Sequence, residues 1–191
     1  MELTHIFDQT FDKIDYTTTP IPKAEYERCV FNNCNFSNGN LSGVEFLECE
    51  FNGCDLSMVK LTKTALKDVR FNNCKMLGLR FDHCDAFGLV CNFENCIVHY
   101  ASFYQMKLKK TLFKNTQLHQ ADFTECDCSG AVFDRCDLAD AKFENSILEK
   151  TDFRGAFNYT IDPDLNRIKK AKFSLAGLPG LLDKYDIDIS R

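Results

Sequence analysis

A period of five residues runs through most of this sequence and limits its possible folds more than any other feature. A large apolar residue, mostly Phe or Leu, recurs at every fifth position from Phe31 to Phe81. After a shift of two residues near Ala86 the series resumes and continues from Phe93 to Phe153. This period matches neither the turn of an α-helix nor the alternation of a β-strand. It indicates an internal repeat that is far too long to be chance.

A small residue lies two positions before each large one, and most of the cysteines belong to this second set. Of the 11 cysteines only Cys128 takes a large position instead. The period itself creates C-x4-C spacings such as Cys29 and Cys34, and a free cysteine packs as a small apolar side chain. Zinc would need four ligands converging on one point, whereas stacked cysteines would hold their sulfurs in a line. We therefore expect buried packing residues, with no disulfide, metal or cofactor.

The two sets combine into the pattern A/C-[D/N]-[F/L]-x-x, as in CNF at 34–36, ADF at 121–123 and TDF at 151–153. This pattern resembles the pentapeptide-repeat family, and the resemblance covers roughly residues 26–158, with a fainter start at Phe11. It implies an all-β fold, a right-handed quadrilateral parallel β-helix with four five-residue faces in each coil. The large and small residues would point inward, and the other three positions would face solvent.

A comparison of positions that lie one full coil apart, or four repeats along the chain, tests this four-sided geometry. It places one column of phenylalanines from Phe31 through Phe113 to Phe153, and it places a second column, rich in Phe, on the opposite wall. Six to seven coils, spaced as paired strands are, would give a rod roughly 30 Å long. The same comparison predicts that His99 and His119 stack one coil apart at outward positions.

Three segments follow from where the repeat begins, slips and fades. Residues 1–25 would form an N-terminal cap with an irregular first coil, and residues 26–158 the β-helix, with a phase slip at about 86–92. A bulge or kink fits the slip, where Gly88 can supply an unusual φ. Residues 159–191 would form a C-terminal cap or dimerisation tail, with a short helix at 177–185 and a strand at 187–189.

Composition and motifs exclude several classes of function. The chain has no apolar run long enough for a membrane span, and its acidic N-terminus does not resemble a signal peptide. We therefore expect a cytoplasmic protein that contacts no membrane. A net charge of −5 argues against a basic nucleic-acid-binding surface over the whole molecule. No nucleophile, phosphate-loop or dinucleotide motif is present, so we expect no enzyme and no catalytic residues.

Charge is banded along the sequence. Between residues 60 and 80 six basic residues, including Lys63, Lys67 and Arg70, accompany only Asp68. Between 121 and 152 acidic residues dominate, and they form our candidate partner-binding surface: Asp122, Glu125, Asp127, Asp134, Asp137, Asp140, Glu144, Glu149 and Asp152. One interpretation is an ordinary solubilising surface with both signs. The other is a phosphate-like surface presented to the basic groove of a DNA-binding enzyme.

The tail extends the resemblance to the quinolone-resistance (Qnr-type) pentapeptide proteins and the mycobacterial gyrase inhibitor. The match lies in the order of helix and strand and in residues such as Lys172 and Phe173. It implies a head-to-head homodimer, whose candidate interface and cap residues are Leu178, Leu181, Leu182, Tyr185, Ile187 and Ile189. In such a dimer the acidic coils would flank the two-fold axis.

Two functions follow as hypotheses. The first is a non-enzymatic DNA mimic that binds a type II topoisomerase, such as DNA gyrase or topoisomerase IV, and gives fluoroquinolone tolerance. The second is a protein–protein interaction scaffold, which would use the basic coil at 60–80 or the outward aromatic residues Tyr100 and Tyr104.

Overall fold

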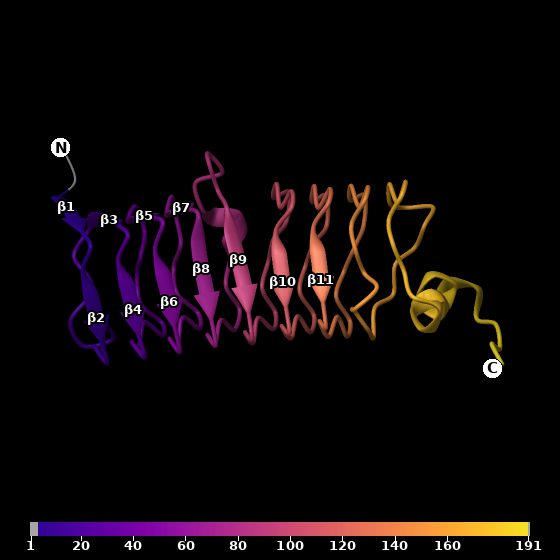
Figure 1. Ribbon diagram of the computed structural model, residues 1–191, viewed down its shortest axis with the longest axis horizontal. Helices are drawn as coiled ribbons and strands as arrows, with labels where there is room; N and C mark the ends of the chain where they lie inside the picture. Colours follow the sequence, from indigo (N-terminus) through magenta and orange to yellow (C-terminus); the bar gives the residue numbers. More distant parts are fainter. Residues whose placement is uncertain (1–3, 191) are drawn as a thin grey trace.

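The chain winds into a right-handed, four-sided parallel β-helix whose coils stack along one long axis (Figure 1). The computed structural model describes residues 4–190. All paired strands are parallel, and they form one sheet in the order β1-β3-β5-β7 and another in the order β11-β10-β9-β8-β6-β4-β2. Partners lie one coil apart, as Phe31 and Phe51 do, and the phase slip adds two positions between Phe71 and Phe93. The predicted fold class is therefore confirmed.

The strands are short because each face of a coil has only five residues. Their bounds are β1 Thr4–Phe7, β2 Thr10–Asp12, β3 Ala24–Glu27, β4 Val30–Asn32, β5 Glu45–Leu47, β6 Glu50–Asn52, β7 Ala65–Lys67, β8 Val69–Asn72, β9 Cys91–Glu94, β10 Leu112–Lys114 and β11 Val132–Asp134. Three 3-10 helices complete the described chain: η1 Phe81–His83, η2 Leu175–Leu181 and η3 Asp183–Tyr185.

Each coil has four faces, which we number in chain order. The first face carries β1, β3, β5 and β7 and, farther along the rod, the stacked segments 107–110, 127–130, 147–150 and 167–170. The second face carries the strands from β2 to β11. On the third and fourth faces, successive coils are joined by isolated bridges, such as Asn35 with Asp55 on the third face and Asn40 with Lys60 on the fourth. Bridges continue as far as Asp152 with Lys172, so hydrogen-bonded coils extend beyond the segment 26–158.

Phenylalanine rings fill the rod as two ladders. On the second face an unbroken series of stacked rings runs from Phe11 to Phe173, and Phe93, Phe113 and Phe133 are spaced 4.9 Å apart with interplanar angles of 2°. The ladder on the opposite wall meets the first one edge to face, as Phe103 does with Phe113 at 83°. These edge-to-face and stacked contacts are the arrangements that aromatic rings favour. The predicted column from Phe31 to Phe153 is confirmed.

The cysteines are packing residues, and their thiols also donate hydrogen bonds. Ten of the eleven are buried, and Cys84 is half-buried. Cys54 Sγ lies 3.3 Å from the carbonyl oxygen of Phe31 in the preceding coil, and Cys126 Sγ lies 2.7 Å from that of Phe103. Ser146 donates its hydroxyl to Phe123 in the same way. The small inward position therefore favours a compact side chain that can also donate a hydrogen bond to a backbone carbonyl oxygen of the preceding coil.

The phase slip produces a projecting loop rather than the expected bulge or kink. Residues 85–90 form a loop between η1 and β9. Its ends stay joined to the preceding coil, because the Asp85 and Val90 N–H groups donate to Thr64 and Leu66, and Figure 1 shows the loop rising above β8 and β9. Gly88 has the predicted unusual φ, +70°. Phe87 at the loop is 81% exposed. Two extra residues cannot be accommodated in a face of five, so the chain leaves the coil to preserve the register of the next one.

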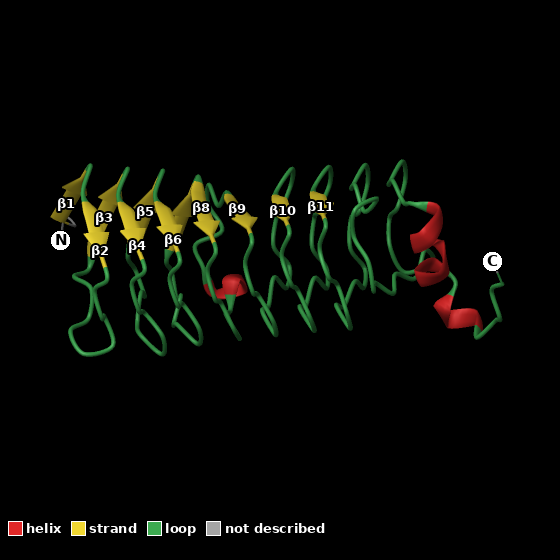
Figure 2. Cartoon of the chain, turned by 60° about the horizontal axis from the view of Figure 1, so that its bottom comes forward, coloured by secondary structure: helices red, strands yellow, loops and turns green. Residues whose placement is uncertain are grey.

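The C-terminal segment closes the last coil with the helices η2 and η3 (Figure 2). Both are short 3-10 helices. η3 lies within the predicted helical region 177–185, whereas η2 begins two residues before that region, at Leu175. The predicted strand at 187–189 is wrong for the single chain, since these residues have no strand geometry and pair with no other described residue. A strand needs a neighbouring backbone to pair with, and the tail extends away from the rod (Figure 1).

Candidate protein-binding surfaces

The nine predicted acidic residues surround the rod instead of lying on one side. Parallel bridges place Asp127 with Lys107 on the first face, Asp152 with Val132 on the second and Asp137 with Gln117 on the third, while Asp122 lies on the fourth beside Ser102. Their coil neighbours follow them, with Glu149 on the first face, Asp134 on the second, Asp140 on the third, and Glu125 and Glu144 on the fourth. The sequence window gathers these charges, but the coil distributes them over four faces.

Several of these aspartates have a structural role at the corners of the coil. Asp122, Asp127, Asp137 and Asp152 each accept a hydrogen bond from the backbone N–H two residues later, at distances of 2.9 to 3.2 Å. Such Asx turns explain why Asp and Asn are common before the large apolar residue. Side-chain hydrogen bonds from Arg154 lower the pKa of Asp152 to about 2. Burial opposes ionisation of Asp127, yet bonds from Ser129 and Lys109 hold its pKa below the ordinary value.

Six of the nine candidate acidic residues form ion pairs with basic residues of the same chain. Asp127 lies 3.0 Å from Lys109, Glu149 lies 2.7 Å from Arg167, and Asp152 lies 2.7 Å from Arg154. Asp134, Asp137 and Glu144 also have basic neighbours within 4.0 Å. Asp122, Glu125 and Asp140 form no ion pair with any residue between 4 and 190. Of the nine candidates, these three are therefore the carboxylates without a basic neighbour, although Glu125 accepts hydrogen bonds from Gln105 at 2.8 Å and from Tyr104 at 3.4 Å.

The basic coil at 60–80 is largely neutralised by the coil before it. Arg70 lies 3.1 Å from Glu50, and Lys75 lies 3.4 Å from Asp55, and in both pairs the acidic residue occupies the equivalent position of the preceding coil. Lys67 lies 3.2 Å from Glu45, and Arg80 lies 2.6 Å from Asp82. Lys60 and Lys63 remain without an ion pair among the described residues. The sequence already held this signal, because charges should be compared between equivalent positions of adjacent coils rather than along the chain.

The C-terminal end of the rod carries a cluster of exposed apolar residues. Leu178 is 41% exposed, Leu182 37%, and Tyr185, Ile187 and Ile189 at least 50%. A groove of about 530 Å³ lies between η2 and the tail, lined by Leu175, Ala176, Leu178, Pro179, Leu182, Ile189 and Ser190. Leu181 differs from the other predicted interface residues, because it is only partly exposed and packs against the core. An apolar patch at the open end of a solenoid is typical of an interaction surface.

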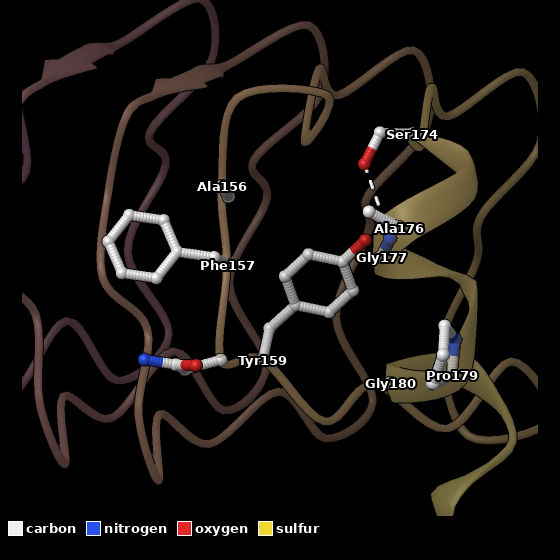
Figure 3. Close-up of a pocket in the computed structure, with 9 residues that line it drawn as sticks. Ala156, Phe157, Tyr159, Ser174, Ala176, Gly177, Pro179 and Gly180 are labelled. Atoms are coloured by element: carbon white, nitrogen blue, oxygen red, sulfur yellow. Dashed lines mark hydrogen bonds between the residues drawn. The ribbon is translucent and has the colours of Figure 1, made fainter. Parts of the chain in front are cut away.

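Two glycines let η2 lie close against Tyr159 (Figure 3). A Cβ atom at Gly177 would lie 2.0 Å from the Tyr159 hydroxyl, and one at Gly180 would lie 2.1 Å from the Tyr159 carbonyl oxygen. The Ser174 side chain accepts the Gly177 N–H at 3.2 Å and begins the helix. A pocket of about 280 Å³ remains beside Tyr159, lined by these residues together with Ala156 and Phe157. The close approach fixes η2 to the last coil and so positions the apolar cluster.

The histidines lie at exposed or half-buried, outward positions of the coils. His99 and His119 stack with ring centroids 4.3 Å apart, as predicted. Burial and the charge of His119 lower the pKa of His99. One cluster among residues 4–190 could offer three metal ligands, because atoms of His5, Glu25 and Glu27 lie within 4.8 Å of one another. His5 Nε2 already contacts Glu27 at 3.0 Å, and this pair satisfies both side chains without an ion.

The coil geometry defines a class of protein, the four-sided β-solenoid built from five-residue units, and comparisons with known proteins agree. A model of the pentapeptide repeat region matches residues 24–90, and a model of eight pentapeptide repeats matches residues 116–155. Together these matches span more than half of the sequence, and the chain belongs to the pentapeptide-repeat family. No helix within residues 4–190 is both long and apolar enough to cross a membrane.

Solved structures share the fold at low sequence identity. Two trypsin-treated variants of QnrB1, a plasmid-mediated fluoroquinolone resistance protein, match with TM-scores of 0.62 and 0.61 and identities of 17% and 18%. The alignments cover 99% or more of this chain and of each matched chain. No curated protein sequence matches the chain. At these identities the likeness establishes the fold.

Proposed function

We propose that this chain is a non-enzymatic binding protein that pairs through its C-terminal end into a rod of double length. The observation that carries the proposal is the apolar cluster around η2 and the tail, where Leu175 is 88% exposed, Ile187 55% and Ile189 50%. Isologous pairing of two such ends would cover these side chains and would give residues 187–189 the backbone partner that a strand requires.

For the partner we propose a type II topoisomerase, bound through the acidic residues that lack ion pairs. Asp122 and Glu125 lie on the fourth face and Asp140 on the third, all in the half of the rod nearest the C-terminal end. End-to-end pairing would place a copy of this set on each side of the joint. Such paired acidic surfaces suit a basic DNA-binding groove. The QnrB1 structures are described as those of a fluoroquinolone resistance protein, and we extend that activity to this chain only as part of the proposal.

A supercoiling assay with purified DNA gyrase tests this partner. The intact protein should inhibit supercoiling or restore it in the presence of ciprofloxacin at micromolar concentration. The triple variant Asp122→Asn, Glu125→Gln and Asp140→Asn should weaken this effect at least about tenfold, since each exposed charge contributes up to ~1 kcal/mol. The double variant Asp15→Asn and Asp85→Asn, in the other half of the rod, is the matched control, because both residues are exposed and without an ion pair among the described residues. No effect of the intact protein would reject topoisomerase binding.

A second candidate function, a scaffold for another protein, is favoured by exposed aromatic residues near the middle of the rod. Tyr100 is 58% exposed and Tyr104 38%, and the loop at 85–90 adds Phe87. Aromatic side chains of this kind are enriched among the residues that dominate protein interfaces. Partners that survive charge reversal at Lys63 but are lost from the double variant Tyr100→Ala and Tyr104→Ala would favour this function.

A further inference from the structure

The first face of the rod carries opposite charges on its two halves. Before the loop at 85–90, the segments 24–28, 45–48 and 65–68 form an acidic half with Glu25, Glu27, Glu45, Glu48 and Asp68 against Arg28 and Lys67. After the loop, the segments 107–110, 127–130, 147–150 and 167–170 form a basic half. Its charged residues are Lys107, Lys109, Lys110, Lys150, Arg167, Lys169 and Lys170 against Asp127 and Glu149.

Most of the basic half has no ion-pair partner among residues 4–190. Its two acidic residues are already paired, Asp127 with Lys109 and Glu149 with Arg167. Five lysines of this half form no ion pair with any described residue, and all are exposed: Lys107, Lys110, Lys150, Lys169 and Lys170. On the second face, by contrast, charges meet across coils, as Lys114 and Glu94 do at 2.7 Å. The excess positive charge on the first face is therefore exposed to solvent and available to an external partner.

The acidic half has a matching excess. Glu25, Glu48 and Asp68 form no ion pair within residues 4–190, and Glu48 and Asp68 are exposed. Glu48 and Asp68 occupy the same corner of adjacent coils, with φ of 53° and 54°, and Lys150 and Lys170 occupy that corner of two other adjacent coils, both with φ of 61°. Each pair is thus separated by one coil, about 4.8 Å. Two pairs with equal spacing and opposite charge can align when the rods run in opposite directions.

We propose that the first face binds the first face of a second copy of this chain, side by side and antiparallel. A two-fold axis that lies in the plane of the face, perpendicular to the rod and level with segment 107–110, would bring each acidic half toward the other copy's basic half. Glu48 and Asp68 of one copy would then meet Lys170 and Lys150 of the other. The acidic half argues against a nucleic-acid duplex along the rod, since it would repel the phosphates beside it. This surface is separate from the C-terminal apolar cluster and does not depend on the proposed function.

Two charge-reversed variants of the full chain test the proposal. The all-acidic variant carries Lys110→Glu, Lys150→Glu and Lys170→Glu, and the all-basic variant carries Glu25→Lys, Glu48→Lys and Asp68→Lys. Sedimentation velocity and the scattering cross-section are measured at about 20 mM salt and at about 500 mM salt, where exposed charges are screened. The cross-section separates side-by-side pairing from end-to-end pairing, because only the former widens the rod.

We expect the wild-type rod to widen at low salt and to narrow at high salt. Each variant alone should pair at least roughly tenfold more weakly than wild type, and an equal mixture of the two should pair again, because their faces are then complementary. The double variant Lys60→Glu and Lys63→Glu, on the fourth face, should behave as wild type. A wild-type rod that never widens, or a mixture that stays unpaired, would overturn the proposal. So would a labelled DNA duplex that binds the basic half of wild type in place of a second copy.

Discussion

Replacing Phe113 with alanine should destabilise the β-helix more than almost any other single substitution. The side chain is 0% exposed. It stacks on Phe93 and Phe133 at 4.9 Å and meets the edges of Phe103 and Phe123 at 5.9 and 6.0 Å. Truncating a buried Phe to Ala costs about 3–5 kcal/mol, and losing the ring pairs places this site toward the upper end of that range. We expect a loss of about 4 kcal/mol in the free energy of unfolding.

Urea denaturation followed by far-ultraviolet circular dichroism measures this loss. Phe87→Ala is the matched control, because that ring is 81% exposed at the loop and its removal should change stability by less than about 0.5 kcal/mol. Phe113→Leu should cost clearly less than Phe113→Ala, since Leu fills the equivalent inward position on other faces, as Leu118 does. A loss below about 1.5 kcal/mol for Phe113→Ala, or equal losses at Phe113 and Phe87, would refute the reasoning from ladder packing.

Three further predictions concern the thiols, the end of the rod and the response to acid. Cys126→Ser should cost less than about 1 kcal/mol in urea denaturation, because a hydroxyl can donate to the same carbonyl oxygen, whereas Cys126→Leu should cost more through overpacking. Gly177→Ala should lower the melting temperature by displacing η2, and Tyr159→Phe should partly restore it, because the hydroxyl it removes is the atom nearest the new methyl group. Asp152, whose pKa is about 2 in the folded chain, should stabilise the fold above pH 4 and lose that contribution as pH falls through 2. Asp152→Asn should therefore flatten the acid-unfolding curve, with a loss of up to about 1 kcal/mol at neutral pH.

The inward half of the structure could be predicted from the sequence because its period is set by the backbone. A coil of four five-residue faces repeats after every fourth pentapeptide, so Phe113 had to stack on Phe133, and His99 had to meet His119. The sequence also located the phase slip, and Gly88 has the conformation expected there. The sequence did not show the outcome of the slip, because the sequence pattern alone does not distinguish a bulge within a face from a loop outside it.

The outward half was harder to predict because surface neighbours depend on the stacking of coils. Grouping residues 60–80 as a basic coil concealed that Arg70 and Lys75 meet Glu50 and Asp55, which belong to the previous coil. The same grouping made the acids of residues 121–152 look like one surface, although they lie on four faces. The strand expected at 187–189 depends on a second backbone, which local sequence signals do not describe.

Small-angle scattering of the full chain at high salt tests the central claim, that the C-terminal end pairs two rods. The stacked coils of one chain span roughly 40 Å at the spacing of paired strands. End-to-end pairing predicts a maximum dimension about twice that of a single chain with an unchanged cross-section, and the triple variant Leu178→Glu, Leu182→Glu and Ile189→Lys should return the particle to single length. A wild-type particle of single length and monomeric mass, or a variant that remains double in length, would contradict the claim.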